Sequence, residues 1–361
     1  MHRPEHKADI ETPALIIDLD KMEANLQRMA DFFANQQATL RPHFKTHKTP
    51  IIAHKQIAAG AKGITCAKLS EAEVLVHHGI NDVLIANQVV DPAKIGRLVD
   101  LAQHSDVIVA VDHADNVAAI SAEAKGRRRP LNVIIEVDVG MTRAGTRSLD
   151  ETLRLARQII SSPGLRLRGL MGYEGHAVFT AERSSRQEAT RVANQLLVEH
   201  AEMLRAQGIE VEIVSAGGSG TYDFSGTYPG ITEVEAGSYV LMDATYKGVG
   251  LPFDCALTVL STVVSLPSPD RAVCDAGIKA MTNEFGLPVV KDLEGVKVKG
   301  LSEEHCSLDL LSPSRKLTLG EKIEFIPSHC CTTINLHDRF YCLRGDRVEA
   351  VWEIAGRGKS Q

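Results

Sequence analysis

Residues 132–138 read Asn-Val-Ile-Ile-Glu-Val-Asp, a run that consists almost entirely of β-branched apolar side chains at its centre. A strand covered on both faces, as in a parallel sheet, has this composition, whereas a strand with one solvated face alternates apolar and polar residues. Residues 149–161 have helical spacing, and a second apolar run follows at 167–172. We therefore predict a parallel strand, a helix and a second parallel strand.

The same alternation extends in both directions. The predicted strands are 39–44, 63–66, 82–86, 106–111, 132–138, 167–172, 210–215 and 232–242. Eight strands alternating with helices predict an α/β fold, a closed (β/α)8 barrel of the TIM type. An open doubly wound sheet is the alternative, but it usually carries a Gly-rich turn after its first strand, and the sequence has none there. In the longest helix, 184–207, the predicted buried face holds Ala189, Val192, Ala193, Leu196 and Met203.

After about residue 250 the pattern changes to short strand-like runs divided by Pro, Gly and Asp, with no helical segment between them. These runs are 257–266, 271–274, 296–301, 322–327, 332–336, 340–344 and 350–354. They predict a second, mostly antiparallel β domain. The run 14–19 precedes the first barrel helix and is expected to join it. The predicted division is a barrel over 20–248 and a β domain over 1–19 plus 249–361.

Composition narrows the class of protein. The net charge of −6 provides no basic surface for nucleic acid, and no stretch has the roughly 18 uncharged apolar residues that span a membrane. Residues 1–12 lack the apolar core of a signal peptide. The seven cysteines are odd in number and lack disulfide-like spacing, which suits a reducing compartment. We predict a cytoplasmic protein that acts on a small molecule.

One lysine stands at a reactive position. Arg41-Pro42-His43-Phe44-Lys45-Thr46-His47-Lys48 directly follows the first predicted strand, so Lys45 lies at the rim where barrel enzymes place reacting groups. A partly desolvated lysine loses its proton more readily and can form a Schiff base. The alternative is a solvated surface pair, Lys45 and Lys48.

A phosphate site is predicted at the seventh and eighth strands. Ser215-Ala216-Gly217-Gly218-Ser219-Gly220-Thr221 offers backbone N–H groups and two hydroxyls after the seventh strand, where barrels frequently bind phosphate. A simple turn is the alternative. The predicted binding residues are Gly218, Ser219, Gly220 and Thr221, with Gly237, Ser238 and Tyr239 of the eighth strand completing the site.

Further candidates follow the fifth and sixth strands. Arg143 can face a cofactor or a substrate carboxylate, or it can pair with a surface acid. Tyr173 can bond to or stack on a cofactor, and His176 can transfer protons; both can also line the rim without a role.

Pro327-Ser328-His329-Cys330-Cys331 suggests a metal site in the β domain. In a strand, His329 and Cys331 would project to one face while Cys330 points away. Imidazole with thiolate favours zinc, with manganese or cobalt as further options. The alternative is a core histidine beside two buried cysteines.

The motif Arg-Pro-His-x-Lys-Thr-His-Lys after the first strand resembles the family of D-threonine aldolases and eukaryotic-type D-serine dehydratases, which are alanine-racemase-like pyridoxal phosphate enzymes. The similarity extends from residues 12–14 to 352–356. It implies that Lys45 carries pyridoxal 5'-phosphate, that Arg143 lies in the cofactor pocket and that both Gly-containing segments flank the phosphate. It also implies a zinc or manganese ion on His329 and Cys331, and a homodimer. His43, Asp275 and His305 are weaker candidates for substrate or second-layer contacts.

Two reactions on D-β-hydroxy-α-amino acids fit the resemblance. A D-threonine aldolase would release glycine and acetaldehyde, with His176 or a metal-bound water as base. A dehydratase of D-serine or D-threo-3-hydroxyaspartate would use Lys45 to remove the Cα proton. The His-x-Cys pair favours the dehydratase, whereas residues 172–176 and 332–338 look more like the aldolase branch. A racemase needs a second base opposite Lys45, and a non-catalytic cofactor carrier would lack the second domain.

Overall fold

The computed structural model describes residues 4–361, which divide into two compact units. The barrel unit comprises residues 29–45, 52–237 and 359–361, and the β unit comprises the residues up to Arg28 with 46–51 and 238–358. The predicted domain boundaries at 19/20 and 248/249 stay predictions. Met1–Arg3, which were assigned to the β domain, lie outside the described residues. In the part of the chain that is described, no helix is long and apolar enough to cross a membrane.

Eight parallel strands form the barrel, as predicted. They are β2 (Thr39–Leu40), β3 (Ile64–Cys66), β4 (Asp82–Gln88), β5 (Asp106–Val111), β6 (Leu131–Glu136), β7 (Leu165–Met171), β8 (Ile213–Ala216) and β9 (Glu233–Val234). Their order in the sheet is β2-β9-β8-β7-β6-β5-β4-β3, and every neighbouring pair is parallel. The prediction of a (β/α)8 fold from strand composition and spacing is confirmed.

The ring is closed by the residues that follow β2. The Thr65 N–H donates to the Pro42 carbonyl at 2.9 Å, and the Phe44 N–H donates to the Thr65 carbonyl at 2.7 Å. His43 and Thr65 form a parallel bridge. The segment that closes the barrel is therefore the one that leads into Lys45.

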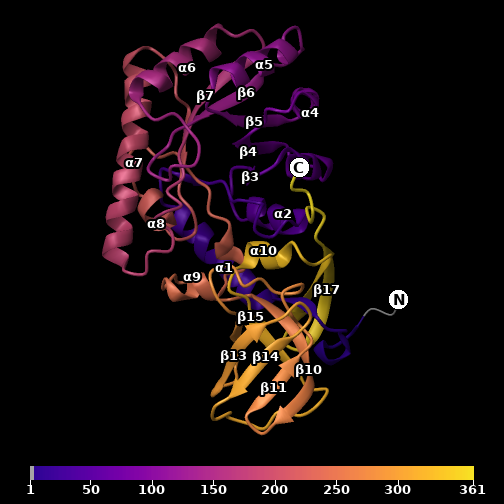
Figure 1. Cartoon of the computed structure of the whole chain (residues 1–361). Helices are drawn as coiled ribbons and strands as arrows, with labels where there is room; N and C mark the ends of the chain where they lie inside the picture. The colour runs from indigo at the N-terminus through magenta and orange to yellow at the C-terminus, as the bar shows by residue number, and fades with distance from the viewer. Residues whose placement is uncertain (1–3) are drawn as a thin grey trace. The chain divides into compact units, whose positions relative to one another are not determined.

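Helices connect the barrel strands, and Figure 1 shows α4 to α7 on the outside of β4 to β7. They are α1 (Leu19–Phe33), α2 (Pro50–Ala58), α3 (Leu69–His77), α4 (Pro92–Ala102), α5 (Ala114–Ala124), α6 (Leu149–Ser161), α7 (Arg183–Ala206) and α8 (Tyr222–Ser225). Local sequence fixes where they begin. At α4, the Asp91 carboxylate accepts the Lys94 N–H and Pro92 occupies the first helical position. Leu84, Ile108, Ile134 and Ile213 form a cluster inside the unit.

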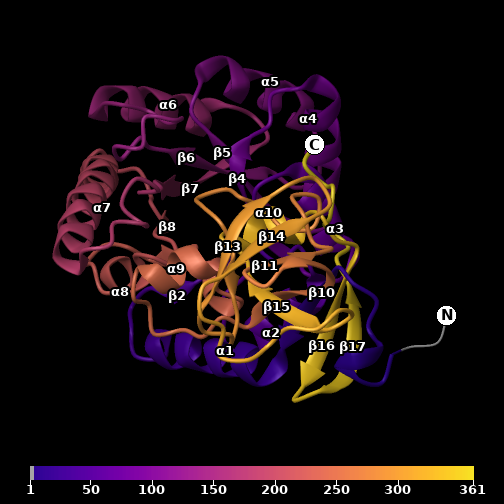
Figure 2. The ribbon, with the colours of Figure 1, turned by 60° about the horizontal axis from the view of Figure 1, so that its bottom comes forward.

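The β unit contains a nine-stranded sheet with the order β13-β14-β11-β10-β1-β16-β17, in which β15 pairs with β10 and β12 pairs with β15. The β16–β17 hairpin lies at one edge (Figure 2). Its strands are β1 (Ala14–Asp18), β10 (Leu257–Ser268), β11 (Arg271–Cys274), β12 (Val289–Val290), β13 (Val296–Leu301), β14 (Cys306–Leu310), β15 (Lys322–Ile326), β16 (Arg339–Arg344) and β17 (Arg347–Glu353). All pairings are antiparallel except that of β1 with β16. The N-terminal run thus lies in this sheet, as expected.

Four short helical elements complete the β unit: η1 (Lys7–Asp9), η2 (Ser238–Val240), α9 (Ala244–Gly248) and α10 (Cys330–Ile334). The prediction of a strand at 332–336 is wrong, because α10 occupies it. The helix begins where the Cys330 N–H donates to the Asp243 carboxylate at 3.0 Å, a contact across 87 residues that the local sequence does not reveal.

The eighth barrel strand is also shorter than the predicted 232–242. The sheet pairing ends at Val234, and the Leu241 and Met242 N–H groups turn back to the Ser238 carbonyl. Met242 has a φ of 58°, which is incompatible with a continuing strand.

Candidate active site

Lys45 lies two residues beyond the bridge that closes the barrel. Its backbone N–H donates to Nδ1 of the buried His43 at 3.3 Å, so the predicted second-layer residue His43 shapes the turn that carries the lysine. The Lys45 ammonium lies 5.4 Å from the centroid of the Tyr173 ring. Tyr173 follows β7, so the rim brings these two predicted residues together.

Arg143 lies at the same rim, with its guanidinium 5.8 Å from the Tyr173 ring centroid. Its Nη2 is 3.5 Å from Oε1 of the buried Glu136, whose Oε2 accepts a hydrogen bond from Gln88 Nε2 at 2.6 Å. Half of the Arg143 side chain is exposed. Since Glu136 and Gln88 hold one side of this cation, the rest of it can meet an anionic or polar ligand.

The Gly-rich loop after β8 is held from beneath by Glu174, whose side chain is fully buried. One carboxylate oxygen accepts the Gly217 N–H at 3.1 Å, and the other accepts the hydroxyls of Thr221 at 2.6 Å and Ser225 at 3.3 Å. Burial raises the pKa of Glu174, and the hydrogen bonds from Thr221 and Gly217 oppose that rise. Glu174 lies between the predicted site residues Tyr173 and His176, and no role is predicted for it from the sequence.

Glycine is required at two positions of this loop. Gly217 has a φ of 80°, and a Cβ on Gly220 would stand 2.1 Å from the Val178 carbonyl oxygen. The loop can therefore pass close to its neighbours and present its backbone to a ligand, as a phosphate site requires.

The Thr221 hydroxyl, a predicted phosphate contact, is hydrogen-bonded to Glu174 and within the loop. The hydroxyl hydrogen is used on Glu174, and its oxygen accepts the Gly218 N–H at 3.1 Å. Thr221 therefore braces the loop, and Gly218, Ser219, Gly220 and Thr221 stay the predicted phosphate contacts.

Glu235 is a second residue without a predicted role. Ser215 donates to its carboxylate at 2.7 Å. Burial raises the pKa of Glu235 to about 7, while the Ser215 hydrogen bond and the charge of Lys45 act in the opposite direction. A carboxyl that gains and loses a proton near neutrality beside Lys45 is a functional candidate.

The remaining barrel candidates are more dispersed. His176 is exposed, and its ring packs against Gly140, where an added Cβ would stand 3.2 Å from its Cε1. Gly237 ends the barrel unit, whereas Ser238 and Tyr239 belong to the β unit. The Tyr239 ring is buried against Phe253, with 5.7 Å between ring centroids.

In the β unit, His329, Cys330 and Cys331 form a group of metal-ligand side chains whose donor atoms lie within 4.8 Å of one another. His329 and Cys331 were predicted to converge because they would alternate along a strand. Instead, His329 is the N-cap residue of α10 and Cys331 lies in the first turn of this helix. Cys330 does not point away as expected. The donor set of one imidazole and two thiols fits a borderline-soft divalent ion such as zinc.

Two side chains contact this group. Asp243 Oδ2 lies 3.0 Å from His329 Nδ1, and Cys331 Sγ lies 3.4 Å from Thr46 Oγ1. Burial lowers the pKa of His329, but Cys331 and the Asp243 hydrogen bond outweigh it and raise that pKa to about 10. The neighbouring Cys330 thiol and His329 lower the pKa of Cys331, which favours the thiolate form that metals bind.

Asp275 and His305 do not join this group through any hydrogen bond. The Asp275 carboxylate accepts from Ser261, Thr262 and Thr12, which are strand and N-terminal residues of the β unit. The His305 side chain is exposed.

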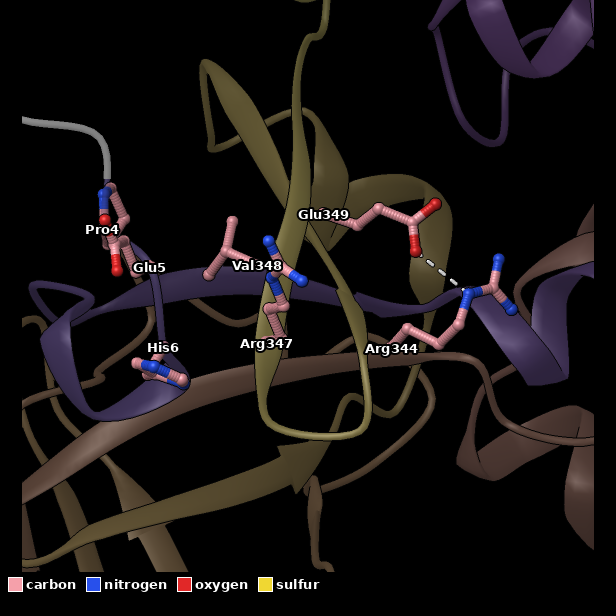
Figure 3. Close-up of a pocket in the computed structure, with 7 residues that line it drawn as sticks. All are labelled: Pro4, Glu5, His6, Arg344, Arg347, Val348 and Glu349. Carbon is pink, nitrogen blue, oxygen red and sulfur yellow. Dashed lines mark hydrogen bonds and ion pairs between the residues drawn. The ribbon is translucent and has the colours of Figure 1, made fainter.

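Figure 3 shows a surface pocket of the β unit between the N-terminal segment and the β16–β17 hairpin. Its Arg344 donates to Glu349 at 2.9 Å and also pairs with Asp20 and Glu23, so its charge is balanced. None of the predicted site residues lines this pocket.

Comparisons with known proteins bear on both units. The family model described as "Alanine racemase, N-terminal domain" matches residues 17–245, and "Putative serine dehydratase domain" matches residues 256–343. The chain is 38% identical over 358 residues to a D-threonine aldolase of Arthrobacter sp, with 98% of this chain and 94% of the relative covered. It is 34% identical to a 3-hydroxy-D-aspartate aldolase of Paracoccus denitrificans (98% and 94% covered) and 31% identical to a D-threo-3-hydroxyaspartate dehydratase of Delftia sp. (95% and 97% covered).

Solved structures agree. A D-threonine aldolase from Filomicrobium marinum superposes with a TM-score of 0.97 at 36% identity, with all of both chains covered. A cysteine-to-alanine mutant of a D-threo-3-hydroxyaspartate dehydratase, described as metal-free, superposes with a TM-score of 0.89 at 30% identity over 97% of this chain and 99% of that one. A histidine-to-alanine mutant of the same dehydratase, substituted two positions earlier, superposes equally well.

Proposed function

The chain belongs to the alanine-racemase-like family of pyridoxal phosphate-dependent lyases that includes D-threonine aldolase, and from that premise we propose that it cleaves D-threonine to glycine and acetaldehyde. The observation that carries the proposal is the 38% identity to a D-threonine aldolase over 98% of this chain, together with Lys45 at the barrel rim. A small D-β-hydroxy-α-amino acid is the substrate class.

The barrel residues fit pyridoxal phosphate, which supplies an electron sink for the bonds at Cα when it is bound. Lys45 is the proposed attachment point. Residues 218–220 would hold the phosphate on the loop braced by Glu174, and Tyr173 and Arg143 would flank the ring. Glu235 is the carboxyl available to the ring nitrogen, because its pKa of about 7 lets it share a proton.

His329 and Cys331 are the proposed metal ligands, and the metal, when bound, supplies Lewis acidity at the substrate β-hydroxyl. Zinc or manganese is proposed; thiolate favours zinc. Two single mutants of the dehydratase, one at a histidine and one at a cysteine two positions later, have the spacing of His329 and Cys331, and the cysteine mutant is described in a metal-free form. Thr46, which contacts Cys331, is the residue after Lys45 in the chain.

The chain's own residues would then move protons. His176 is the proposed acceptor of the β-hydroxyl proton, since imidazole suits proton transfer near neutral pH. The Lys45 amine is the proposed carrier of protons at Cα, because it is the amine displaced when substrate binds.

A dehydratase of D-serine or D-threo-3-hydroxyaspartate is the second candidate. The observation in its favour is Cys331 itself, since the Delftia-type dehydratase also has a histidine and a cysteine two positions apart. In that reaction Lys45 would remove the Cα proton and the products would be a keto acid and ammonia.

The test is product analysis of the purified protein with D-threonine, D-serine and D-threo-3-hydroxyaspartate, before and after chelation. Glycine and acetaldehyde that disappear on chelation and return with manganese or zinc are expected. Keto acid and ammonia would establish the dehydratase instead. Lys45→Ala should lose the long-wavelength absorption of the bound cofactor, whereas Lys125→Ala, at an exposed lysine, should keep it. Undiminished turnover of Lys45→Ala would refute the proposal.

We also propose a cytoplasmic homodimer. All seven cysteines are free thiols, which suits a reducing compartment. Four apolar side chains of the β unit are exposed between the end of β11 and the start of β12, as in a subunit interface: Ile278, Phe285, Leu287 and Val289. Sedimentation of the wild type and of Leu287→Asp checks this proposal: the wild type should sediment as a dimer and the variant as a weaker one.

A further inference from the structure

We propose that Asp243 is the positioning residue of the metal site, because its buried carboxylate holds the Nδ1 side of the His329 ring and so makes Nε2 the nitrogen that binds the ion. This inference rests on the proposed function, since it assumes that His329 is a metal ligand. Asp243 lies far from His329 in sequence, and nothing in its local sequence marks it as part of a site.

The contacts are specific. Asp243 is fully buried, and its Oδ2 lies 3.0 Å from His329 Nδ1 and 3.0 Å from the Cys330 backbone nitrogen. Its Oδ1 accepts the Tyr246 N–H at 2.8 Å and so caps α9. Both oxygens are therefore engaged, and the carboxylate cannot rotate without losing a hydrogen bond.

The chemistry of the carboxylate sets the tautomer. An ionised carboxylate only accepts hydrogen bonds, so the His329 nitrogen facing it must carry the hydrogen. The second ring nitrogen, Nε2, is then the one that would give up its hydrogen and bind the ion. Metal-bound histidines usually donate their other N–H to a carboxylate or carbonyl, which fixes the ring orientation and raises ligand basicity.

The same carboxylate also positions the other ligand. By accepting the Cys330 N–H it sets the start of α10, whose first turn carries Cys331. One buried residue thus fixes the rotation of the imidazole and the place of the helix that presents the thiolate.

The decisive variant is Asp243→Asn. Asparagine can still accept the Tyr246 N–H through its oxygen, but its NH2 group would then face both the Cys330 N–H and His329 Nδ1. The imidazole would have to accept at Nδ1, which puts the hydrogen on Nε2. Affinity for zinc or cobalt, measured by titration of the chelated protein with a competing dye or by the cobalt absorption bands, should fall by about 10- to 100-fold.

Asp91→Asn is the matched control. Asp91 likewise caps a helix, since its carboxylate accepts the Lys94 N–H, but it lies on the barrel surface. The metal affinity of Asp91→Asn should equal that of the wild type. Cofactor absorption should be retained in both variants, which separates metal loss from a general loss of structure.

A second measurement applies even if Asp243→Asn does not fold. In zinc-loaded wild-type protein with 15N-labelled histidine, the signals absent from His329→Gln should show a protonated Nδ1 and a metal-bound Nε2. An unprotonated or metal-bound Nδ1, or unchanged affinity in Asp243→Asn, would overturn the inference. A wild-type protein that binds no metal at all would instead refute the metal site in the proposed function.

Discussion

The Arg41 guanidinium forms two hydrogen bonds with the Glu233 carboxylate, from Nε at 2.8 Å and from Nη2 at 3.0 Å, and both side chains are buried. The pair joins the first barrel strand to the last, because Thr39 and Leu40 pair with Glu233 and Val234. It therefore secures the closing strands of the ring.

We expect Arg41→Ala to lower the free energy of unfolding by about 3–5 kcal/mol, because it leaves Glu233 charged and buried without this partner. Arg344→Ala provides the contrast. Arg344 pairs with three acids but is 41% exposed, so water screens these pairs and its loss should cost much less stability than the loss of Arg41. Urea unfolding of both variants measures the difference, and equal losses would contradict it.

Glu174 should control cofactor affinity without touching the cofactor. Glu174→Ala removes the acceptor for Gly217 and Thr221, so the loop loses its brace and the affinity for pyridoxal phosphate should fall by about 10-fold, from the 1–3 kcal/mol cost of unsatisfied buried groups. Titration of the apoprotein with the cofactor, followed by absorbance, measures this. Glu182→Ala, at an exposed acid that bonds only to Ser184 and Ser185, should behave as the wild type.

Adjacent cysteines should behave differently. Cys331→Ala should abolish tight metal binding, whereas Cys330→Ala should retain it, because burial and the neighbouring Cys331 raise the pKa of Cys330 and keep its thiol protonated. Cys331→Asp should bind manganese better relative to zinc than the wild type does, since a carboxylate is a harder ligand. Metal content after dialysis against each ion tests all three. Equal metal loss in both alanine variants would assign Cys330 as a ligand too.

Stability should fall in mild acid because of His200. Burial lowers the pKa of His200 below its ordinary 6.5, although the charge of Glu199 opposes that shift, and its ring bonds to Thr152 at 2.8 Å. Below pH 6.5 the unfolded chain binds a proton there that the folded chain does not, so the free energy of unfolding decreases as pH falls, by at most about 1.4 kcal/mol per unit.

His200→Gln removes this titration and keeps a polar partner for Thr152. Its unfolding free energy should depend less on pH between about 5 and 6.5 than that of the wild type. If the unfolding free energies of the wild type and His200→Gln fell equally as the pH was lowered, other groups would account for the acid sensitivity.

Sequence patterns predicted the barrel well because each strand is a run of apolar residues that can be recognised within the strand's own sequence. They failed where a distant residue decides the local structure. The α10 helix begins on Asp243, and Glu174 and Glu235 gain their roles only from the loops and strands packed around them. The alternation of Glu233 and Glu235 within an apolar strand was the one available signal for buried acids.

The α7 helix shows the same limit. Its predicted buried face is wrong in part: Val192 is 53% exposed, whereas Thr190, Asn194 and His200 are buried. These polar side chains find hydrogen-bond partners in the interior; for example, Asn194 Nδ2 donates to the Ser225 hydroxyl at 3.1 Å. Apolar spacing alone cannot identify a face on which buried polar groups find partners.

Closure of the barrel between β2 and its two neighbours has a consequence for how the protein is made. Leu40 must meet both Lys62 and Val234, so the growing chain has two unpaired strand edges until synthesis has passed the last barrel strand. A fragment that ends before Glu233 would expose those edges permanently and would tend to associate through them. Synthesis past Val234 is thus the point at which the barrel first has no unpaired strand edge.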